Sequence, residues 1–255
     1  MNQTAKLRAI LVDDEELARQ ILREYLGRAG DVEIVAECAN GFEAVKAAGE
    51  LRPDLLFLDI QMPKLDGFEV LELIDPPVAV IFVTAYDQYA MKAFDAAAVD
   101  YLLKPFSTDR LAQALERARA LLRDPQPRPL QAAELAAAAR PPGQALQRVV
   151  VKDGTKVHII PIAKLDYVEA QDDYIALHSE KKHYLKQQTI TSIEQQLDPA
   201  RFARIHRSYI VNLERIARIE PYTKDSRVAV LQDGSQLPVS RSGYVRLKEL
   251  LGENV

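Results

Sequence analysis

Four short apolar runs in the first half of the chain each end abruptly in a polar side chain. They are residues 9–12 before Asp13 and Asp14, 55–58 before Asp59, 80–83 before Thr84, and 101–103 before Lys104. Short apolar runs of this kind are typical of strands buried on both faces. Helical patterns lie between and after them, at residues 16–29, 41–51, 67–74, 88–96 and 108–123. This alternation predicts five βα units and a parallel, doubly wound α/β sheet with helices on both faces.

The polar residues that end these runs have complementary chemistry. The carboxyl ends of the strands meet at one edge of such a sheet, where open α/β sheets bind their ligands. Asp13 and Asp14 offer the hard oxygen ligands that Mg²⁺ prefers. Thr84 and Lys104 offer a hydroxyl and a cation that can hold phosphoryl oxygens. Asp59 is a nucleophile that can accept a phosphoryl group as an acyl phosphate.

This arrangement resembles the receiver domain of two-component response regulators. The resemblance covers about the first half of the chain, and it includes Pro105 and the Asp66-Gly67 turn as well as the strand ends. It implies a flavodoxin-like (βα)5 fold, a Mg²⁺ cofactor, and phosphorylation of Asp59 by a sensor histidine kinase. The alternative is a flavodoxin-like fold whose acidic cluster is idle.

The resemblance also implies roles for individual residues. Asp14 would ligate the metal directly, Asp13 would act largely through water, and Asp59 and the Gln61 carbonyl would complete the set. Tyr101 matches the family's switch aromatic, which acts together with Thr84 and Lys104. The face built from residues 88–96, 101–103 and 108–123 would then form a homodimer on phosphorylation.

Length, cysteine content and charge narrow the class of protein. The 255 residues fit one large or two ordinary domains, and the single Cys38 excludes an internal disulfide. No apolar run approaches a membrane-spanning length, and the N-terminus does not resemble a secretory signal, so we expect a cytoplasmic protein without a membrane partner. Residues 1–124 carry 14 Lys+Arg and 22 Asp+Glu, a balance of −8, whereas residues 145–255 carry 17 and 14, a balance of +3. The second half is only modestly suited to an anionic partner.

Residues 125–147 have the composition of a linker between domains at 1–124 and 148–255. The segment contains five prolines and Gly143 around an alanine-rich stretch at 131–140. It is either a semi-rigid spacer or a helix packed between the domains. An isolated helix of that length is marginal in water.

The residues from 148 onward predict a mainly β domain. Residues 148–152 and 155–160 flank Asp153-Gly154, a pattern typical of a β-hairpin with a type I′ turn. Further strands are expected at 165–170, 174–178, 183–186, 203–206, 215–220, 227–231 and 236–239, with a short helix at 191–197 and a hairpin turn at Asp233-Gly234. These strands are too short and too closely spaced for βαβ units.

Two short motifs in this domain carry a second resemblance. They are RIHRSYIVN at 204–212 and PVSR at 238–241. Together they resemble the LytTR DNA-binding domain, the output module of LytR/AlgR-class response regulators, over about residues 149–250. The resemblance implies an elongated β-sheet domain that reads double-stranded DNA with loops instead of a recognition helix.

The residue types in these motifs suit DNA contacts. Arg207 and Arg241 each follow a short strand, so a guanidinium on a loop can bond guanine O6 and N7 in a major groove. The remaining candidates are His206, Ser208 and Lys186 as phosphate-positioning groups, and Gln171, Asp173 and Tyr174 in the family's third contact region.

Several of these residues have a plain structural alternative. His206 can be a core histidine bonded to backbone, and Arg241 an ordinary surface cation. Asp172 or Asp173 is expected to shape its turn, and Asn212 is expected to be a turn residue. The apolar stretch 209–211 is expected in the core.

The sequence therefore favours a phosphorylation-switched transcriptional regulator that pairs on tandem half-sites of DNA, and not an enzyme. One alternative is a receiver joined to a protein-binding β module, which the weak basic charge leaves open. A receiver that controls an enzyme is disfavoured, because the second half lacks a Gly-rich phosphate loop, a Cys/His dyad and a zinc motif.

Overall fold

The computed structural model describes residues 6–75, 78–85, 98–123, 146–154, 156–222 and 226–252. The chain divides into two compact units, Met1–Pro142 and Gly143–Val255. The division lies inside the segment 125–147 that the sequence marks as a linker, but residues 124–145 are outside the described residues, as is the predicted helix 88–96. Among the helices of the described residues, none is long and apolar enough to cross a membrane.

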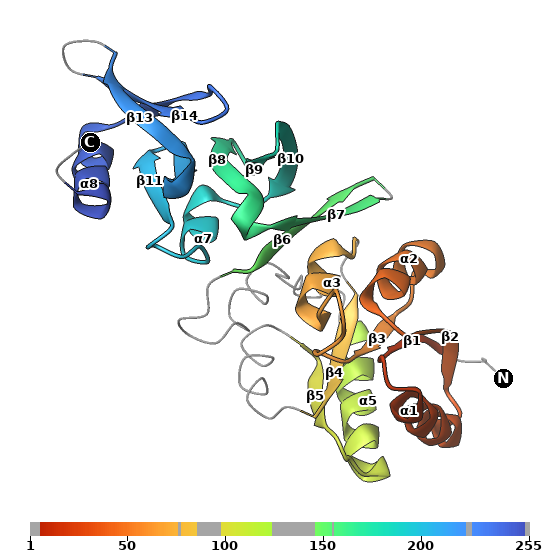
Figure 1. Ribbon diagram of the computed structural model, residues 1–255. Coiled ribbons are helices and arrows are strands. Elements are labelled where there is room, and N and C mark those ends of the chain that lie inside the picture. Colours follow the sequence, from red (N-terminus) through yellow and green to blue (C-terminus); the bar gives the residue numbers. More distant parts are fainter. Residues whose placement is uncertain are drawn as a thin grey trace. The chain divides into compact units, whose positions relative to one another are not determined.

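The first unit is a parallel five-stranded sheet in the order β2-β1-β3-β4-β5. Its strands are β1 (Leu7–Val12), β2 (Val32–Cys38), β3 (Leu55–Leu58), β4 (Ala79–Thr84) and β5 (Asp100–Leu103). Its helices are α1 (Glu16–Ala29), α2 (Gly41–Leu51), α3 (Gly67–Leu73) and α5 (Thr108–Arg123). Helices α1 and α5 cover one face and α2 and α3 the other (Figure 1). The predicted doubly wound α/β fold is confirmed, and strand order reverses between β1 and β3.

Apolar burial on both faces explains why these runs are continuous. Every residue of β3 is fully buried, and Leu22 and Leu26 of α1 pack with Leu111 and Leu115 of α5 against the sheet. Each such side chain contributes about 1.5–3 kcal/mol when it leaves water.

One helix end differs from the sequence prediction. Helix α3 ends at Leu73, because Ile74 has extended dihedral angles. Helix α5 has the predicted bounds, and the hydroxyl of the preceding Ser107 accepts a hydrogen bond from the Arg110 amide.

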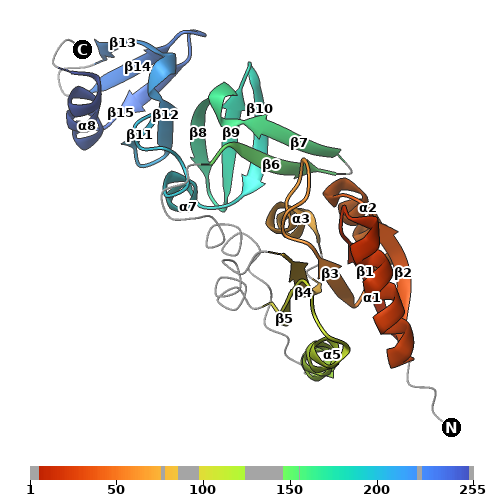
Figure 2. The same cartoon turned by 60° about the horizontal axis from the view of Figure 1, so that its bottom comes forward.

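In the described residues, the second unit consists of three antiparallel sheets, two α-helices and two 3-10 helices (Figure 2). The two-stranded sheet contains β6 (Arg148–Asp153) and β7 (Lys156–Pro161). The five-stranded sheet has the order β10-β9-β8-β12-β11, from β8 (Leu165–Gln171), β9 (Tyr174–Ser179), β10 (Lys182–Gln187), β11 (Phe202–His206) and β12 (Tyr209–Asn212). The three-stranded sheet contains β13 (Ile216–Pro221), β14 (Arg227–Leu231) and β15 (Gln236–Val239). The predicted mainly β class of this unit is confirmed.

Two short 3-10 helices and two α-helices join and cover these sheets. They are η2 (Ile162–Lys164), η3 (Leu213–Arg215), α7 (Ile190–Glu194) and α8 (Arg241–Leu251). The predicted helix 191–197 is shorter and starts earlier, because Thr189 caps it through the Ser192 amide. Helix α8 was missed altogether, although Ser240 is a good N-cap and apolar residues follow at helical spacing.

The first hairpin differs by one residue from its prediction. Asp153 pairs with Lys156, so Asp153 is the last residue of β6 and not the first residue of the turn. Gly154 has a φ of 59°, the left-handed conformation that glycine adopts readily.

Candidate functional site

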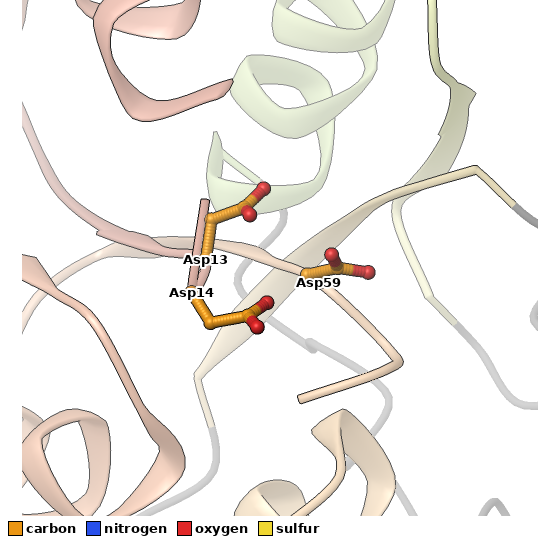
Figure 3. Close-up of side chains that lie close together, drawn as sticks. All are labelled: Asp13, Asp14 and Asp59. Atoms are coloured by element: carbon orange, nitrogen blue, oxygen red, sulfur yellow. The ribbon is translucent and has the colours of Figure 1, made fainter. Parts of the chain in front are cut away.

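Three carboxylates meet at the carboxyl edge of the parallel sheet. Val12 pairs with Leu58, so Asp13 and Asp59 follow paired positions on adjacent strands, and the Asp59 amide donates to the Val12 carbonyl at 2.9 Å. One carboxylate oxygen from each of Asp13, Asp14 and Asp59 lies within 4.8 Å of the others (Figure 3). Asp13 and Asp59 are buried, whereas Asp14 is exposed. The structure thus brings the three predicted acidic residues together in a cluster that could hold a metal ion.

Lys104 inserts its ammonium group between two of these carboxylates. Its Nζ lies 2.6 Å from Asp13 Oδ2 and 2.9 Å from Asp59 Oδ2. Burial by itself lowers the pKa of Lys104, but the hydrogen bonds and charges of the two carboxylates outweigh it and raise that pKa. Burial raises the pKa of Asp13, and Lys104 opposes that effect only in part. The site therefore holds a fixed cation beside the buried carboxyl group of Asp13, whose burial the cation offsets only in part.

Thr84 ends β4 beside this cluster with its hydroxyl unused. Thr84 pairs with Leu103, and its carbonyl accepts from the Lys104 amide at 2.8 Å. The side chain is fully buried, and its Oγ1 has no hydrogen-bond partner among the described residues. A buried hydroxyl without a partner is costly, which is consistent with a ligand oxygen that completes it. The predicted switch residue Tyr101 on β5 is also buried, at 6% exposure.

Two further residues support the acidic cluster: Arg19, which the sequence did not single out, and Gly67, which it marked only as part of a turn. The buried guanidinium of Arg19 donates to the Asp13 carbonyl at 2.6 Å and also pairs with Glu16. Gly67 begins α3 so close to the phosphoacceptor strand that a Cβ there would overlap the Asp59 carbonyl oxygen. The only sequence signal for Arg19 was a cation on the apolar stripe of its helix, with Leu22 and Leu26.

The carboxylate side chains are further oriented by local backbone groups. Glu15 donates its amide to Asp13 Oδ1 at 3.0 Å, and Gln61 donates its amide to Asp59 Oδ1 at 3.2 Å. Gln61 itself is exposed, directly after the acidic strand end. These bonds help to fix the orientation of the Asp13 and Asp59 carboxylates.

In the second unit, two of the predicted contact loops lie at the same end of the five-stranded sheet. Tyr209 pairs with Glu169, and the Ala170 amide donates to the Ser208 carbonyl at 2.8 Å. The β8–β9 turn, which carries the exposed Gln171, Asp173 and Tyr174, therefore lies beside the β11–β12 turn of Arg207 and Ser208. Asp172 has a φ of 50°, in agreement with its expected turn role.

The β11–β12 turn presents one unrestrained arginine. Arg207 is exposed, and its guanidinium makes no hydrogen bond or ion pair with any described residue. His206 is half-buried, and its Nδ1 accepts from the Ser208 amide at 3.2 Å. Burial and the nearby charge of Arg207 lower the pKa of His206. His206 is thus bonded to backbone, as its structural alternative expects, but it is not a core residue, and its ring borders the turn.

Arg241 is the first residue of α8, not a residue on a loop as predicted. The preceding Ser240 caps the helix through the Gly243 amide at 3.0 Å, and its hydroxyl also donates to the Ile205 carbonyl at 3.0 Å. A Cβ at Gly243 would overlap the Ile205 carbonyl, so the helix start is packed directly on β11. This contact places Arg241 near the β11–β12 turn.

A hollow of about 510 Å³ lies at this junction. Its lining is rich in cations and hydroxyls: Arg204, His206, Arg207, Ser240, Ser242, Gly243 and Arg246. Arg204 and Arg246 received no role in the sequence analysis. They are distant in sequence, and only the docking of α8 on β11 brings them together (Figure 1).

Lys186 and Asn212 have structural roles. Lys186 lies on β10, separated from β12 by two strands of the sheet, and its Nζ donates to the Val150 carbonyl at 3.1 Å. The Lys186 ammonium group thus has a backbone partner on β6, and its strand lies at the edge of the sheet opposite β11. Asn212 is fully buried, donates to the Leu165 carbonyl and caps η3, as expected for a turn residue. Ile210 and Val211 are core residues, while Tyr209 is only half-buried.

Comparison with known proteins accounts for both units. The response regulator receiver domain family matches residues 9–116, and the LytTr DNA-binding domain family matches residues 155–252. The transcriptional regulatory protein BtsR of Escherichia coli is 35% identical over 250 residues, covering 96% of this chain and 99% of BtsR.

Two further relatives match over nearly their whole length. The sensory transduction protein LytT of Bacillus anthracis is 32% identical over 250 residues, covering 96% of this chain and 99% of LytT. An uncharacterized response regulatory protein of Vibrio cholerae is 39% identical over 259 residues, covering 95% and 97% of the two chains. The chain therefore belongs to the LytTR family of response regulators, the transcription regulators of two-component systems that join a receiver domain to a LytTR DNA-binding domain.

Proposed function

We propose that phosphorylation of Asp59 by a sensor histidine kinase switches this chain to a dimer that binds specific DNA. The observation that carries the phosphorylation step is the position of the Lys104 ammonium, 2.6 Å from Asp13 and 2.9 Å from Asp59, beside the unpartnered hydroxyl of Thr84. A nucleophilic carboxylate, a fixed cation and a free hydrogen-bond donor are the groups that phosphoryl transfer requires.

The acidic cluster fits Mg²⁺, because its donors are all hard oxygens and two of them are buried. Asp13, Asp14, Asp59 and the Gln61 carbonyl would hold the ion. When bound, the ion offsets the repulsion between these carboxylates and the incoming phosphoryl oxygens. The raised pKa of Asp13 supports the assignment, since a second cation would relieve the charge that Lys104 leaves uncompensated.

The residues of the chain then have distinct roles. An oxygen of Asp59 attacks phosphorus, the bond to the kinase imidazole nitrogen breaks, and the imidazole leaves while Asp59 becomes an acyl phosphate. Lys104 forms an ion pair with a phosphoryl oxygen, and Thr84 donates its hydrogen bond to another. These new bonds pull on Thr84 at the end of β4 and on Lys104 after β5. The resulting shift changes the conformation of the face that includes Tyr101 and α5.

In the second unit, we assign base reading to Arg207 and Arg241 and phosphate positioning to His206 and Ser208. The unrestrained guanidinium of Arg207 and the adjacent β8–β9 turn with Gln171, Asp173 and Tyr174 support this assignment. Lys186 is left out, because its ammonium group is engaged with the Val150 carbonyl.

Intact-mass measurement after incubation with acetyl phosphate tests the first half of the proposal. The wild-type chain should gain one phosphoryl group only in the presence of Mg²⁺, and Asp59→Asn should gain none. Asp31→Asn is the matched control, because Asp31 is half-exposed and its carboxylate pairs with Arg119. If Asp59→Asn is phosphorylated as fully as the wild-type chain, Asp59 is not the phosphoacceptor.

Footprinting tests the second half. Arg207→Ala and Arg241→Ala should each weaken specific binding by about 1–3 kcal/mol and relax the sequence preference. Arg218→Ala on β13 is the control, since its exposed side chain pairs with Glu220 away from the hollow. Lys186→Ala should leave the salt dependence unchanged, whereas a phosphate contact would lower its slope by about 1. If both arginine variants keep full specificity, a protein-binding role for the second unit becomes the better hypothesis.

A further inference from the structure

Two of the arginines in the α8 hollow share one acidic partner. Glu194, the last residue of α7, accepts from Arg204 at 3.0 Å through Oε2 and from Arg246 at 3.2 Å through Oε1. The side chains of Glu194 and Arg204 are 26% exposed and that of Arg246 is 43% exposed. One carboxylate thus joins α7, β11 and α8 at the cationic hollow.

Arg204 also holds the turn that presents Arg207. The second terminal nitrogen of Arg204 donates to the Arg207 carbonyl at 2.8 Å, while its first nitrogen contacts Glu194 and the Thr191 hydroxyl. The planar guanidinium can make these bonds in fixed directions at once. Glu194 therefore orients Arg204, and Arg204 in turn fixes the backbone from which the unrestrained Arg207 side chain projects.

The charge of Glu194 matters as much as its geometry. The hollow is lined by three arginines, Arg204, Arg207 and Arg246, and Glu194 neutralises part of this charge. Arginines free to move would bind any DNA phosphate, which raises affinity for all sequences alike. Arginines held by a carboxylate contribute less to this indiscriminate binding and leave the discrimination to Arg207.

We propose that Glu194 is a specificity-determining positioning residue of the DNA-binding domain. It restrains Arg204 and Arg246, limits their attraction for phosphates of unrelated DNA, and holds the Arg207 turn for base reading. The inference rests on the proposed role of Arg207 in reading bases.

Glu194→Gln in the full-length chain tests the inference, because it removes the charge and keeps the size. Binding is measured, over a series of salt concentrations, to a duplex selected by the wild-type chain from a random library and to the same duplex scrambled. Glu214→Gln is the matched control: it removes the same charge from an exposed pair with Arg201, 3.1 Å long and outside the hollow.

Glu194→Gln should bind the scrambled duplex several-fold more tightly and steepen the salt dependence by about one to two released counterions. The ratio of specific to scrambled binding should fall by about tenfold, a loss that corresponds to about 1.4 kcal/mol. Glu214→Gln should leave the ratio unchanged. Identical behaviour of the two variants would overturn the inference, and so would a parallel loss of both affinities together with a lower melting temperature.

Arg204→Lys gives a second, independent reading if Glu194→Gln folds poorly. The lysine keeps the charge and can pair with Glu194, but one ammonium group cannot also reproduce the planar contact with the Arg207 carbonyl. For Arg204→Lys the ratio of specific to scrambled binding should fall, although the affinity for the scrambled duplex does not rise. An unchanged ratio would contradict the positioning role. Arg207→Ala separates the two proposals. If Arg207→Ala preserves the ratio of specific to scrambled binding, the base-reading assignment fails. If Arg207→Ala lowers the ratio and Glu194→Gln does not, only the role of Glu194 fails.

Discussion

Two buried carboxylates in the receiver unit have pKa shifts in opposite directions, although burial by itself raises the pKa of both. Asp13 keeps a raised pKa because burial outweighs its contact with Lys104, whose charge it shares with Asp59. Burial also raises the pKa of Asp100, but its hydrogen bonds and ion pairs outweigh burial and lower that pKa. The partners are Arg110, with two bonds at 2.6 and 2.7 Å, the Tyr101 amide and the charge of Arg117. Asp100 is thus a satisfied structural ion, whereas Asp13 is poised for a further cation.

Asp100→Asn should lower the free energy of unfolding by about 1–3 kcal/mol, because it leaves Arg110 without its carboxylate while that arginine remains partly exposed. Asp31→Asn removes a surface pair with Arg119 and should cost about 0–1 kcal/mol. Denaturant unfolding of the three chains measures both differences. Equal stability of Asp100→Asn and Asp31→Asn would contradict the structural role of Asp100.

The effect of Asp100→Asn on the free energy of unfolding should depend on pH, because the pKa of Asp100 is lowered in the folded chain. Since the folded pKa lies below the ordinary value of 3.8, the stabilisation is complete above that value and is lost only as pH falls through the lower folded pKa. The stability difference between wild type and Asp100→Asn should therefore stay constant from neutral pH down to 3.8 and shrink below it. A difference that already shrinks well above this pH would show that another group dominates.

At the scale of elements, the contact between α8 and β11 organises the cationic hollow of the second unit. Helix α8 begins at Arg241 with its cap bonded to Ile205, and β11 ends at His206. The absence of a side chain at Gly243 allows this approach. A change in this contact should therefore move Arg207 and Arg241 together.

Gly243→Ala should destabilise the second unit by about 1–3 kcal/mol, because the new methyl group would overlap the Ile205 backbone. Specific DNA binding should fall with it. Gly49→Ala in α2 is the control: nothing lies within 4 Å of its added Cβ, so it should stabilise the chain by about 0.5–1 kcal/mol. Thermal unfolding and a gel shift on the selected duplex measure both effects. Unaltered binding by Gly243→Ala would show that α8 is not part of the interface.

At the scale of the whole molecule, the two units are separate compact bodies joined through the segment that the sequence marks as a linker. A small β domain that contacts one groove segment buries limited surface and binds weakly. Two such domains held in one dimer gain effective concentration. Under the proposed function, phosphorylation of the receiver would control DNA binding through dimerisation alone.

Beryllofluoride, which mimics the phosphoryl group, should increase the sedimentation coefficient of the wild-type chain to that of a dimer and leave Asp59→Asn unchanged. The protected half-sites should lie about one or two helical turns apart on one DNA face. Insertion of about 5 base pairs between them turns one half-site to the opposite face and should abolish the gain from phosphorylation, while about 10 base pairs should restore part of it. Equal affinity for all three spacings would exclude paired binding.

The sequence by itself predicted the receiver sheet and its strand-end residues, because these features depend on local periodicity. An apolar run buried on both faces needs no partner to be recognised, and in a parallel sheet the carboxyl ends of all strands lie on one edge. Asp13, Asp59, Thr84 and Lys104 could therefore be assigned to one site from their positions at the ends of these runs. The resemblance to the LytTR domain added the expected roles of Arg207 and Arg241.

Only the tertiary structure decided which cations face the hollow and which are engaged elsewhere. Lys186 resembled a phosphate contact by residue type, but strand order puts it on the far edge strand with its ammonium group on Val150. Glu194, Arg204 and Arg246 lie on three different elements, and their meeting depends on the docking of α8 on β11. Such contacts join residues up to 52 positions apart, and no local pattern specifies them, because they arise from how separate elements pack.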